Sequence, residues 1–132
     1  MTDIESVNVY SVELEPWDLE TLEKLEGDPR TRGRIVYEAG PGGSGFGPLG
    51  FAVGVYEQQP CTTAYRLEQN ETVHLLDGDV RIELDSGVSV ELGPGDITVL
   101  PQGQLSTWTF RKPSRVLFVL SAPPSGVDEA TD

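Results

Sequence analysis

Few side chains in this sequence could carry acid–base, nucleophilic or metal chemistry. Among 132 residues there is one histidine, His74, and one cysteine, Cys61. A single cysteine excludes an intramolecular disulfide and a cysteine-cluster metal site, and a single histidine excludes a two-histidine metal site within one chain. The chemistry that remains is proton transfer, for which Glu71 and His74 are the candidates.

Glu71 and His74 lie three residues apart in the segment NETVHLLD, which has the character of a strand. Strict alternation along a strand places the two side chains on opposite faces. His74 then packs on an outer face or at a subunit interface. In the alternative, a β-bulge turns His74 inward, where it becomes the best proton shuttle in the chain.

Several aromatic residues could form the wall of a small-molecule pocket. Tyr56, Tyr65 and Trp108 each combine an apolar ring with a polar group, which suits such a wall. Ser106 lies two residues before Trp108 and should face the same side of its strand. The alternative is ordinary core packing.

The charge of the chain excludes two classes of partner. Asp and Glu number 22 against 9 Lys and Arg, for a net charge of −13. Nucleic acids and anionic membrane surfaces require clustered basic residues, so we expect neither as a partner. Arg66 and Arg111 could hold a ligand carboxylate, although pairing with surface Asp or Glu is favoured here. The sequence contains no apolar run of transmembrane length and no secretion signal at its start, so we expect a cytoplasmic location.

The elements that must position these residues are mainly short strands. Turn residues separate apolar or alternating segments from residue 50 onward, at a spacing typical of a sandwich or closed barrel. The predicted strands span 51–57, 62–68, 71–76, 79–84, 88–92, 97–100, 105–110 and 115–120.

The first fifty residues are less regular. Alternation predicts strands over 7–14 and 34–38, and the near-helical spacing of apolar residues in 17–26 predicts a short helix or turn. The glycine-rich segment 40–50 formally matches a dinucleotide-binding fingerprint, but a strand pattern follows it where that fingerprint needs a helix. We interpret it as a loop, with a position suited to a lid. Residues 1–6 are expected to be flexible and residues 121–132 a disordered acidic tail.

Two spacings resemble a known family. Glu71 is followed by six residues and Gly78, and Gly95 is followed by five residues, Pro101, one residue and Gly103. With the segments NETVHLLDG and LGPGD, this pattern resembles the two motifs of the cupin superfamily. The likeness is to its third subfamily, which includes ethanolamine-utilisation and ureidoglycine-aminohydrolase relatives. The resemblance implies an all-β, RmlC-like jelly-roll β-barrel of two antiparallel sheets, as a single domain over 7–120 whose motif-bearing part is about 50–120.

The chain departs from that family at the metal site. Metal-binding cupins carry a His-x-His pair shortly before the glutamate, and a further histidine in the second motif. The first pair is replaced by Tyr65 and Leu67, or by Ala64 and Arg66, and the last histidine by Ser106. Only Glu71 remains, and one carboxylate does not make a transition-metal site. We therefore expect no metal and no other cofactor, unless a second chain supplies ligands.

Three functions follow from this interpretation. The first is binding of a small organic metabolite, such as a carboxylate or a sugar-like compound, inside the barrel. The expected ligand-binding residues are Tyr56, Tyr65, Leu67, Glu71, Ser106 and Trp108. The second is a metal-independent isomerase, epimerase or lyase with Glu71 as general acid or base, assisted by Tyr65 or His74. The third is a non-catalytic accessory protein that forms a homodimer, in which the apolar run 116–120 lies in the core or the interface.

Overall fold

The computed structural model describes residues 4–19 and 21–123, which form two antiparallel sheets. The described residues contain one short 3-10 helix, η1 (Pro41–Gly43), and no α-helix. The strands are β1 (Glu15–Pro16), β2 (Glu23–Gly27), β3 (Arg32–Ala39), β4 (Phe51–Gln58), β5 (Cys61–Arg66), β6 (Asn70–Asp77), β7 (Val80–Leu84), β8 (Ser89–Leu92), β9 (Ile97–Leu100), β10 (Leu105–Phe110) and β11 (Ser114–Ser121).

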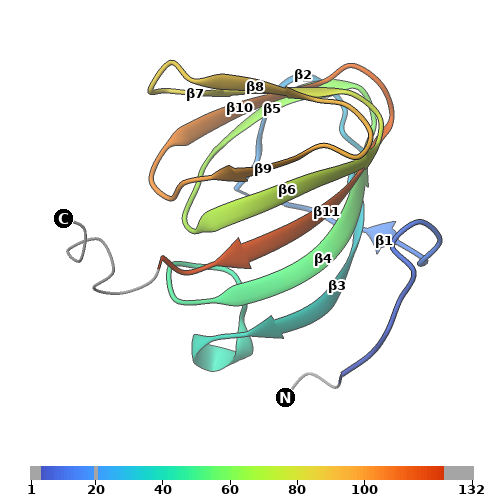
Figure 1. Cartoon of the computed structure of the whole chain (residues 1–132), viewed down its shortest axis with the longest axis vertical. Helices are drawn as coiled ribbons and strands as arrows, with labels where there is room; N and C mark the ends of the chain where they lie inside the picture. Colours follow the sequence, from blue (N-terminus) through green and yellow to red (C-terminus); the bar gives the residue numbers. More distant parts are fainter. Residues whose placement is uncertain (1–3, 20, 124–132) are drawn as a thin grey trace.

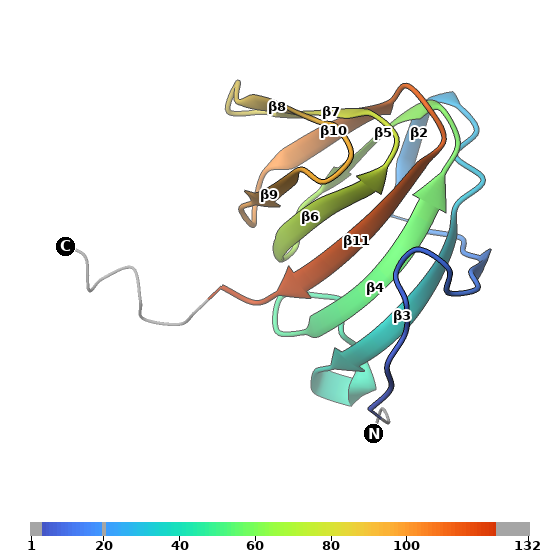
Figure 2. The same cartoon turned by 45° about the vertical axis from the view of Figure 1, so that its right-hand side comes forward.

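The two sheets face one another across the interior (Figure 1). The larger sheet has the order β1-β3-β4-β11-β6-β9, and the smaller one has the order β2-β5-β10-β7-β8. Consecutive strands β4 to β7 alternate between the sheets, as Figure 2 also shows. This arrangement confirms the predicted jelly roll. Within the described residues the two sheets are paired separately and do not close into one continuous barrel.

The strands predicted from residue 50 onward and the strand predicted at 34–38 are all present, with ends that differ by at most two residues. The glycines of the two motifs lie between strands with φ of 113° at Gly78 and 92° at Gly95, a backbone region that favours glycine. The glycine-rich segment 40–50 is a loop with the single 3-10 turn. The predicted end segments 1–6 and 121–132 lie partly outside the described residues.

The strand predicted over 7–14 is wrong. Its apolar residues Val9, Val12 and Leu14 pack onto Val55 and Leu76, on the outer face of the larger sheet. The carbonyl groups of this segment are bound by arginine side chains instead of a strand. Arg115 donates to the carbonyls of Val9 and Val12 (both 2.8 Å), and Arg32 donates to that of Leu14 (2.6 Å).

The predicted helix or turn over 17–26 is wrong for its second half, because residues 23–26 belong to β2, and a turn is present only before it. The amide of Leu22 donates to the carbonyl of Leu19 at 3.1 Å, and the chain then enters β2. The apolar spacing that suggested a helix has another cause, because Trp17, Leu19 and Leu22 all line the interior cavity. No helix in the described part of the chain has the length and apolar character needed to cross a bilayer.

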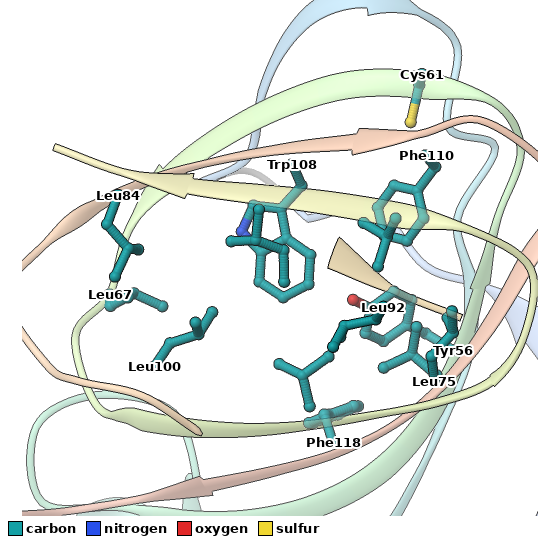
Figure 3. Close-up of a cluster of buried hydrophobic side chains, with 14 residues drawn as sticks. Tyr56, Cys61, Leu67, Leu75, Leu84, Leu92, Leu100, Trp108, Phe110 and Phe118 are labelled. Carbon is teal, nitrogen blue, oxygen red and sulfur yellow. The ribbon is translucent and has the colours of Figure 1, made fainter. Parts of the chain in front are cut away.

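Side chains fill one end of the interior. Figure 3 shows rings and branched side chains from both sheets meeting there, with Trp108 and Phe110 from β10 opposite Leu75 of β6 and Phe118 of β11. Val73, Val80, Ile82 and Val116 complete this core and are fully buried. The cavity described next lies beside this core, and Trp108, Phe110 and Phe118 line it as well.

Candidate functional site

A cavity of about 380 Å³ lies between the two sheets. It is bounded by the inner faces of β4, β5, β6, β10 and β11, by the segment between β1 and β2, and by the loops before β4 and β6. Seven aromatic side chains line it: Trp17, Phe46, Tyr56, Tyr65, Trp108, Phe110 and Phe118. Such a volume and lining suit a small organic molecule with an apolar body.

Glu71 is the buried carboxyl group of this cavity. It lies near the start of β6, in register with Leu120 of β11 and Leu100 of β9, and is 4% exposed. Burial raises its pKa from 4.5 to about 7, against the lowering effect of a hydrogen bond from Tyr65. Near neutral pH the side chain can therefore both accept and return a proton.

Two tyrosine side chains, Tyr65 and Tyr56, interact electrostatically with Glu71. The hydroxyl of Tyr65 on β5 donates a hydrogen bond to Glu71 Oε1. Burial, then the charge of Glu71, raises the pKa of both tyrosines well above 10. Both therefore remain neutral hydrogen-bond donors over the whole working range of Glu71.

Ser106 positions the indole of Trp108. Ser106 is fully buried, and its hydroxyl donates to the carbonyl of Tyr65 at 2.8 Å while accepting a hydrogen bond from Trp108 Nε1 at 2.9 Å. The Trp108 ring then stacks on Tyr65, with a centroid distance of 5.9 Å and an interplanar angle of 22°. One wall of the cavity is thus held in a defined orientation by a buried hydroxyl.

The opposite wall consists of Trp17 stacked on Phe118, with centroids 5.9 Å apart. Two glycines on the larger sheet leave room for these rings. A Cβ atom at Gly54 would lie 2.7 Å from Phe118 Cζ, and one at Gly33 would overlap the indole of Trp17. Sequence reasoning missed the role of Trp17, because only the tertiary structure places it opposite Gly33.

The glycine-rich loop reaches the mouth of the cavity and is held there by Gln69. Phe46 of this loop lines the cavity and packs edge-on against Trp17, with centroids 6.0 Å apart. The Gln69 side chain, which is buried, donates to the carbonyls of Gly45 and Gly50 (both 2.9 Å) and accepts from the amide of Gly47 (3.1 Å). Gln69 was not among the predicted site residues, because it falls between two predicted strands, 62–68 and 71–76.

The structure brings most of the predicted site residues together. Tyr56, Tyr65, Leu67, Glu71 and Trp108 all line the cavity. Ser106 is not among the lining residues, because its hydroxyl is committed to Tyr65 and Trp108.

His74 lies on the other face of β6. It is in register with Leu117 and Ile97, whose side chains belong to the outer face, while its neighbours Val73 and Leu75 point inward. A bulge does occur in β6, but it lies between Leu75 and Asp77, which pair with Val116 and Arg115 of β11. It therefore follows His74 in the chain and does not change the face of His74. The inward alternative for His74 is therefore wrong, and His74 has no access to the cavity.

The two candidate arginines do not point at a buried ligand. Arg111 pairs with Asp79 (3.2 Å) and Glu91 (3.1 Å) on the surface. Arg66 is exposed at the rim of the cavity, and its guanidinium donates to the carbonyl of Gly103 at 2.8 Å. The favoured prediction, that these arginines pair with surface carboxylates, is confirmed for Arg111.

The donors at the expected metal position do not fit a transition metal. Leu67 offers no donor atom, and the Ser106 hydroxyl is already engaged with Tyr65 and Trp108. Glu71 and the neutral phenol of Tyr65 remain, whereas a transition-metal site needs three or four good ligands. No group of three or more His, Cys, Asp or Glu side chains that could hold a metal occurs within residues 4–19 and 21–123.

Solved structures share the fold of this chain at low sequence identity. The polyketide cyclase RemF from Streptomyces resistomycificus is 21% identical, with a TM-score of 0.61, over 92% of this chain and 83% of its own. The cupin domain of Cnp3 from Schizosaccharomyces pombe is 11% identical, with a TM-score of 0.62, over 89% and 74%. The EutQ protein of Clostridium difficile is 16% identical, with a TM-score of 0.55, over 70% and 68%.

The sequence itself identifies the family. Residues 49–116 match the EutQ-like cupin domain, whereas no curated protein matches the chain significantly. The matched segment spans more than half of the 132 residues and includes β4 to β10, with Glu71 and both turn glycines of the motifs. The chain therefore belongs to the family of EutQ-like cupin domains.

Proposed function

We propose that this protein binds a small organic molecule in the cavity between its two sheets, without a metal ion. The observation that carries the proposal is the cavity of about 380 Å³, with seven aromatic side chains around the single buried carboxyl group of Glu71. Apolar walls supply affinity through burial, and a few polar groups give orientation. Because Ser106 already holds the indole of Trp108 in place, less side-chain conformational entropy is lost when a ligand binds.

The test is a thermal-shift screen of a small-metabolite library against the protein and two matched variants. Leu120→Trp places a bulky ring in the cavity, and Val119→Trp places the same ring on the outer face of the same strand. We expect one or more compounds to raise the melting temperature of the wild type and of Val119→Trp but not of Leu120→Trp. A screen without any such compound, or with equal shifts in Leu120→Trp, contradicts the proposal.

A second candidate function is metal-independent acid–base catalysis in the same cavity. It is favoured by the pKa of Glu71, which burial raises to about 7. In an isomerase, the Glu71 carboxylate would take a proton from a C–H bond of the substrate and, once protonated, return it to another atom of the product. In a lyase it would return the proton to the leaving group, and an epimerase would need a second acid on the opposite face of the substrate. Tyr65 would hold Glu71 in place through its hydrogen bond.

The catalytic candidate is tested on whichever compound the screen identifies. We expect Glu71→Gln to abolish turnover of that compound while it remains bound, since the amide cannot accept the proton. Turnover that persists in Glu71→Gln removes Glu71 from the mechanism. Binding without any turnover in the wild type leaves the binding function alone.

A further inference from the structure

The charged groups of the cavity restrict the kind of molecule that it can hold. Glu71 is the one buried charged side chain among the residues that line it. Asp18, Glu68 and Arg66 lie exposed at its rim, and Arg66 donates to the carbonyl of Gly103. The described residues thus give the interior one carboxyl group and no cation.

One oxygen of Glu71 is open to the cavity. The Tyr65 hydroxyl donates to Oε1, and no hydrogen bond from the described residues reaches Oε2. No buried polar side-chain atom of these residues lacks a partner, so Oε2 is not sealed inside the protein wall. A carboxylate oxygen in this position binds a donor, and binds a cationic donor most strongly.

The aromatic walls favour a cationic or ring-containing ligand. Trp108 and Tyr65 from one sheet, and Phe118 with Trp17 on the other side, all line the same space. The electron-rich face of an aromatic ring attracts an organic cation, Trp most strongly. The net charge of −13 also favours the approach of a cation over that of an anion.

A carboxylate ligand, which the sequence alone left open, is disfavoured. Its charge would meet the Glu71 carboxylate, and among the described lining residues the single cation, Arg66, lies exposed at the rim and donates to the carbonyl of Gly103. Resting on the proposed function, we infer that the ligand is an organic cation, with its charged nitrogen against Glu71 Oε2 and its apolar body against Trp108 and Phe118.

This assignment has a consequence for pH. A cation binds the ionised form of Glu71, so binding releases a proton wherever the pKa of about 7 leaves the carboxyl partly protonated. The groups that face Glu71 do not oppose this. Tyr56 and Tyr65 remain neutral. On the neighbouring strands β9 and β11, the apolar residues Leu100 and Leu120 flank Glu71. The charged residues Asp18, Glu68 and Arg66 lie at the rim, and His74 lies on the other face of β6.

The experiment compares three probes that share an indole ring and differ in charge: tryptamine, tryptophol and indole-3-propionate. Calorimetric titration of the wild type at about pH 8 is expected to give an affinity for tryptamine roughly tenfold or more above that for tryptophol. Indole-3-propionate should bind least. The affinity for tryptamine should rise between about pH 6 and pH 8, while that for tryptophol stays level.

Two variants locate the effect. In Glu71→Gln, tryptamine should lose the advantage over tryptophol, while unchanged tryptophol binding confirms an intact cavity. Glu68→Gln removes the same charge at the rim and should change the affinity for tryptamine by less than about twofold, because exposed charges are screened. Tryptamine binding that is absent, or no tighter than tryptophol binding, overturns the organic-cation assignment. The binding function itself fails only if the metabolite screen also finds no ligand.

Discussion

At the scale of single residues, the notable feature is that the carboxyl group of Glu71 is buried. A carboxyl group at 4% exposure is costly to ionise unless it is paired with a cation, and the described residues supply only the neutral hydroxyl of Tyr65. A side chain that serves only packing would be better replaced by an apolar one. The cost of keeping Glu71 is therefore consistent with a role in ligand recognition.

The burial of Glu71 makes stability depend on pH. Its pKa is about 7 in the folded chain and ordinarily 4.5. As pH rises from about 4.5 to 7, the unfolded chain loses this proton before the folded chain does, so the folded state loses stability. At about pH 8 we expect Glu71→Gln to be more stable than the wild type, by at most about 3 kcal/mol, and near pH 4 the difference should vanish. Urea unfolding at both pH values checks this, with the exposed Glu68→Gln as control; a difference independent of pH contradicts it.

Removal of the Tyr65 hydroxyl should move this transition. Its hydrogen bond lowers the pKa of Glu71, so Tyr65→Phe is expected to raise that pKa above about 7. The pKa can be measured from the carboxyl carbon of Glu71 by NMR titration. A pKa that falls toward 4.5 in Tyr65→Phe would mean that solvent, not burial, controls this group.

Ser106 gives a second prediction at this scale. Ser106→Ala leaves the buried indole N–H of Trp108 and the carbonyl of Tyr65 without this partner, which should cost about 1–3 kcal/mol in the free energy of unfolding. Ser89→Ala, at an exposed position of β8, should be near neutral. Equal effects of the two substitutions, measured by urea unfolding, would exclude this role for Ser106.

At the scale of elements, the cavity exists because two strands of the larger sheet carry glycine where a side chain would otherwise point inward. Gly33 of β3 leaves room for Trp17, which belongs to the segment that crosses from β1 to β2. In Gly33→Ala, the added methyl group should displace the indole of Trp17 from Phe118. With Trp108→Phe as background, the fluorescence of Trp17 should shift to longer wavelength. An unchanged spectrum would show that the indole tolerates the methyl group in place.

The glycine-rich loop 40–50 is held at the mouth of the cavity by hydrogen bonds to Gln69. Gln69→Glu replaces two donated hydrogen bonds, to Gly45 and Gly50, with an acceptor that cannot make them. We expect faster amide hydrogen exchange in residues 44–50 and faster ligand exchange, with a cavity that still binds. Gln59→Glu adds the same charge outside the loop contacts and should leave the exchange rates unchanged. Equal rates in both variants would mean that Gln69 does not hold the loop.

At the scale of the whole molecule, no strand among residues 4–19 and 21–123 pairs with the outer edge of the larger sheet. β9 is its last strand, and Ile97 and Val99 are 62% and 61% exposed on the outer face, in register with His74 and Thr72. Exposed apolar residues on an edge strand favour pairing with another chain. In a chain of net charge −13, this uncharged strip is a surface on which two copies can meet with less repulsion.

We therefore expect a homodimer formed through β9. Light scattering after size exclusion should give twice the mass of one chain, and Val99→Lys should give the monomer, because it places a charge on the apolar edge strand of both copies. Val88→Lys changes an equally apolar exposed residue, 55% exposed, in the β7–β8 turn and should remain dimeric. A monomeric wild type at high concentration excludes the dimer.

The sequence by itself determined the strands from residue 50 onward, the turns at Gly78 and Gly95, and the family. These follow from local alternation and backbone geometry, which act over a few residues. Alternation also separated Glu71 from His74, leaving only a bulge as an alternative. The replacement of the usual metal-ligating histidines by Tyr65, Leu67 and Ser106 was visible in the motif spacing.

Only the tertiary structure decided what surrounds Glu71. Trp17 reaches the cavity because Gly33, sixteen residues later, leaves space for it, and Gln69 holds a loop some twenty residues earlier in the chain. The segment 7–14 has the alternation of a strand, yet Arg115 binds its carbonyl groups from the far end of the sequence. Such contacts depend on which segments the two sheets bring together, and a local pattern contains no information about a partner so distant in the chain.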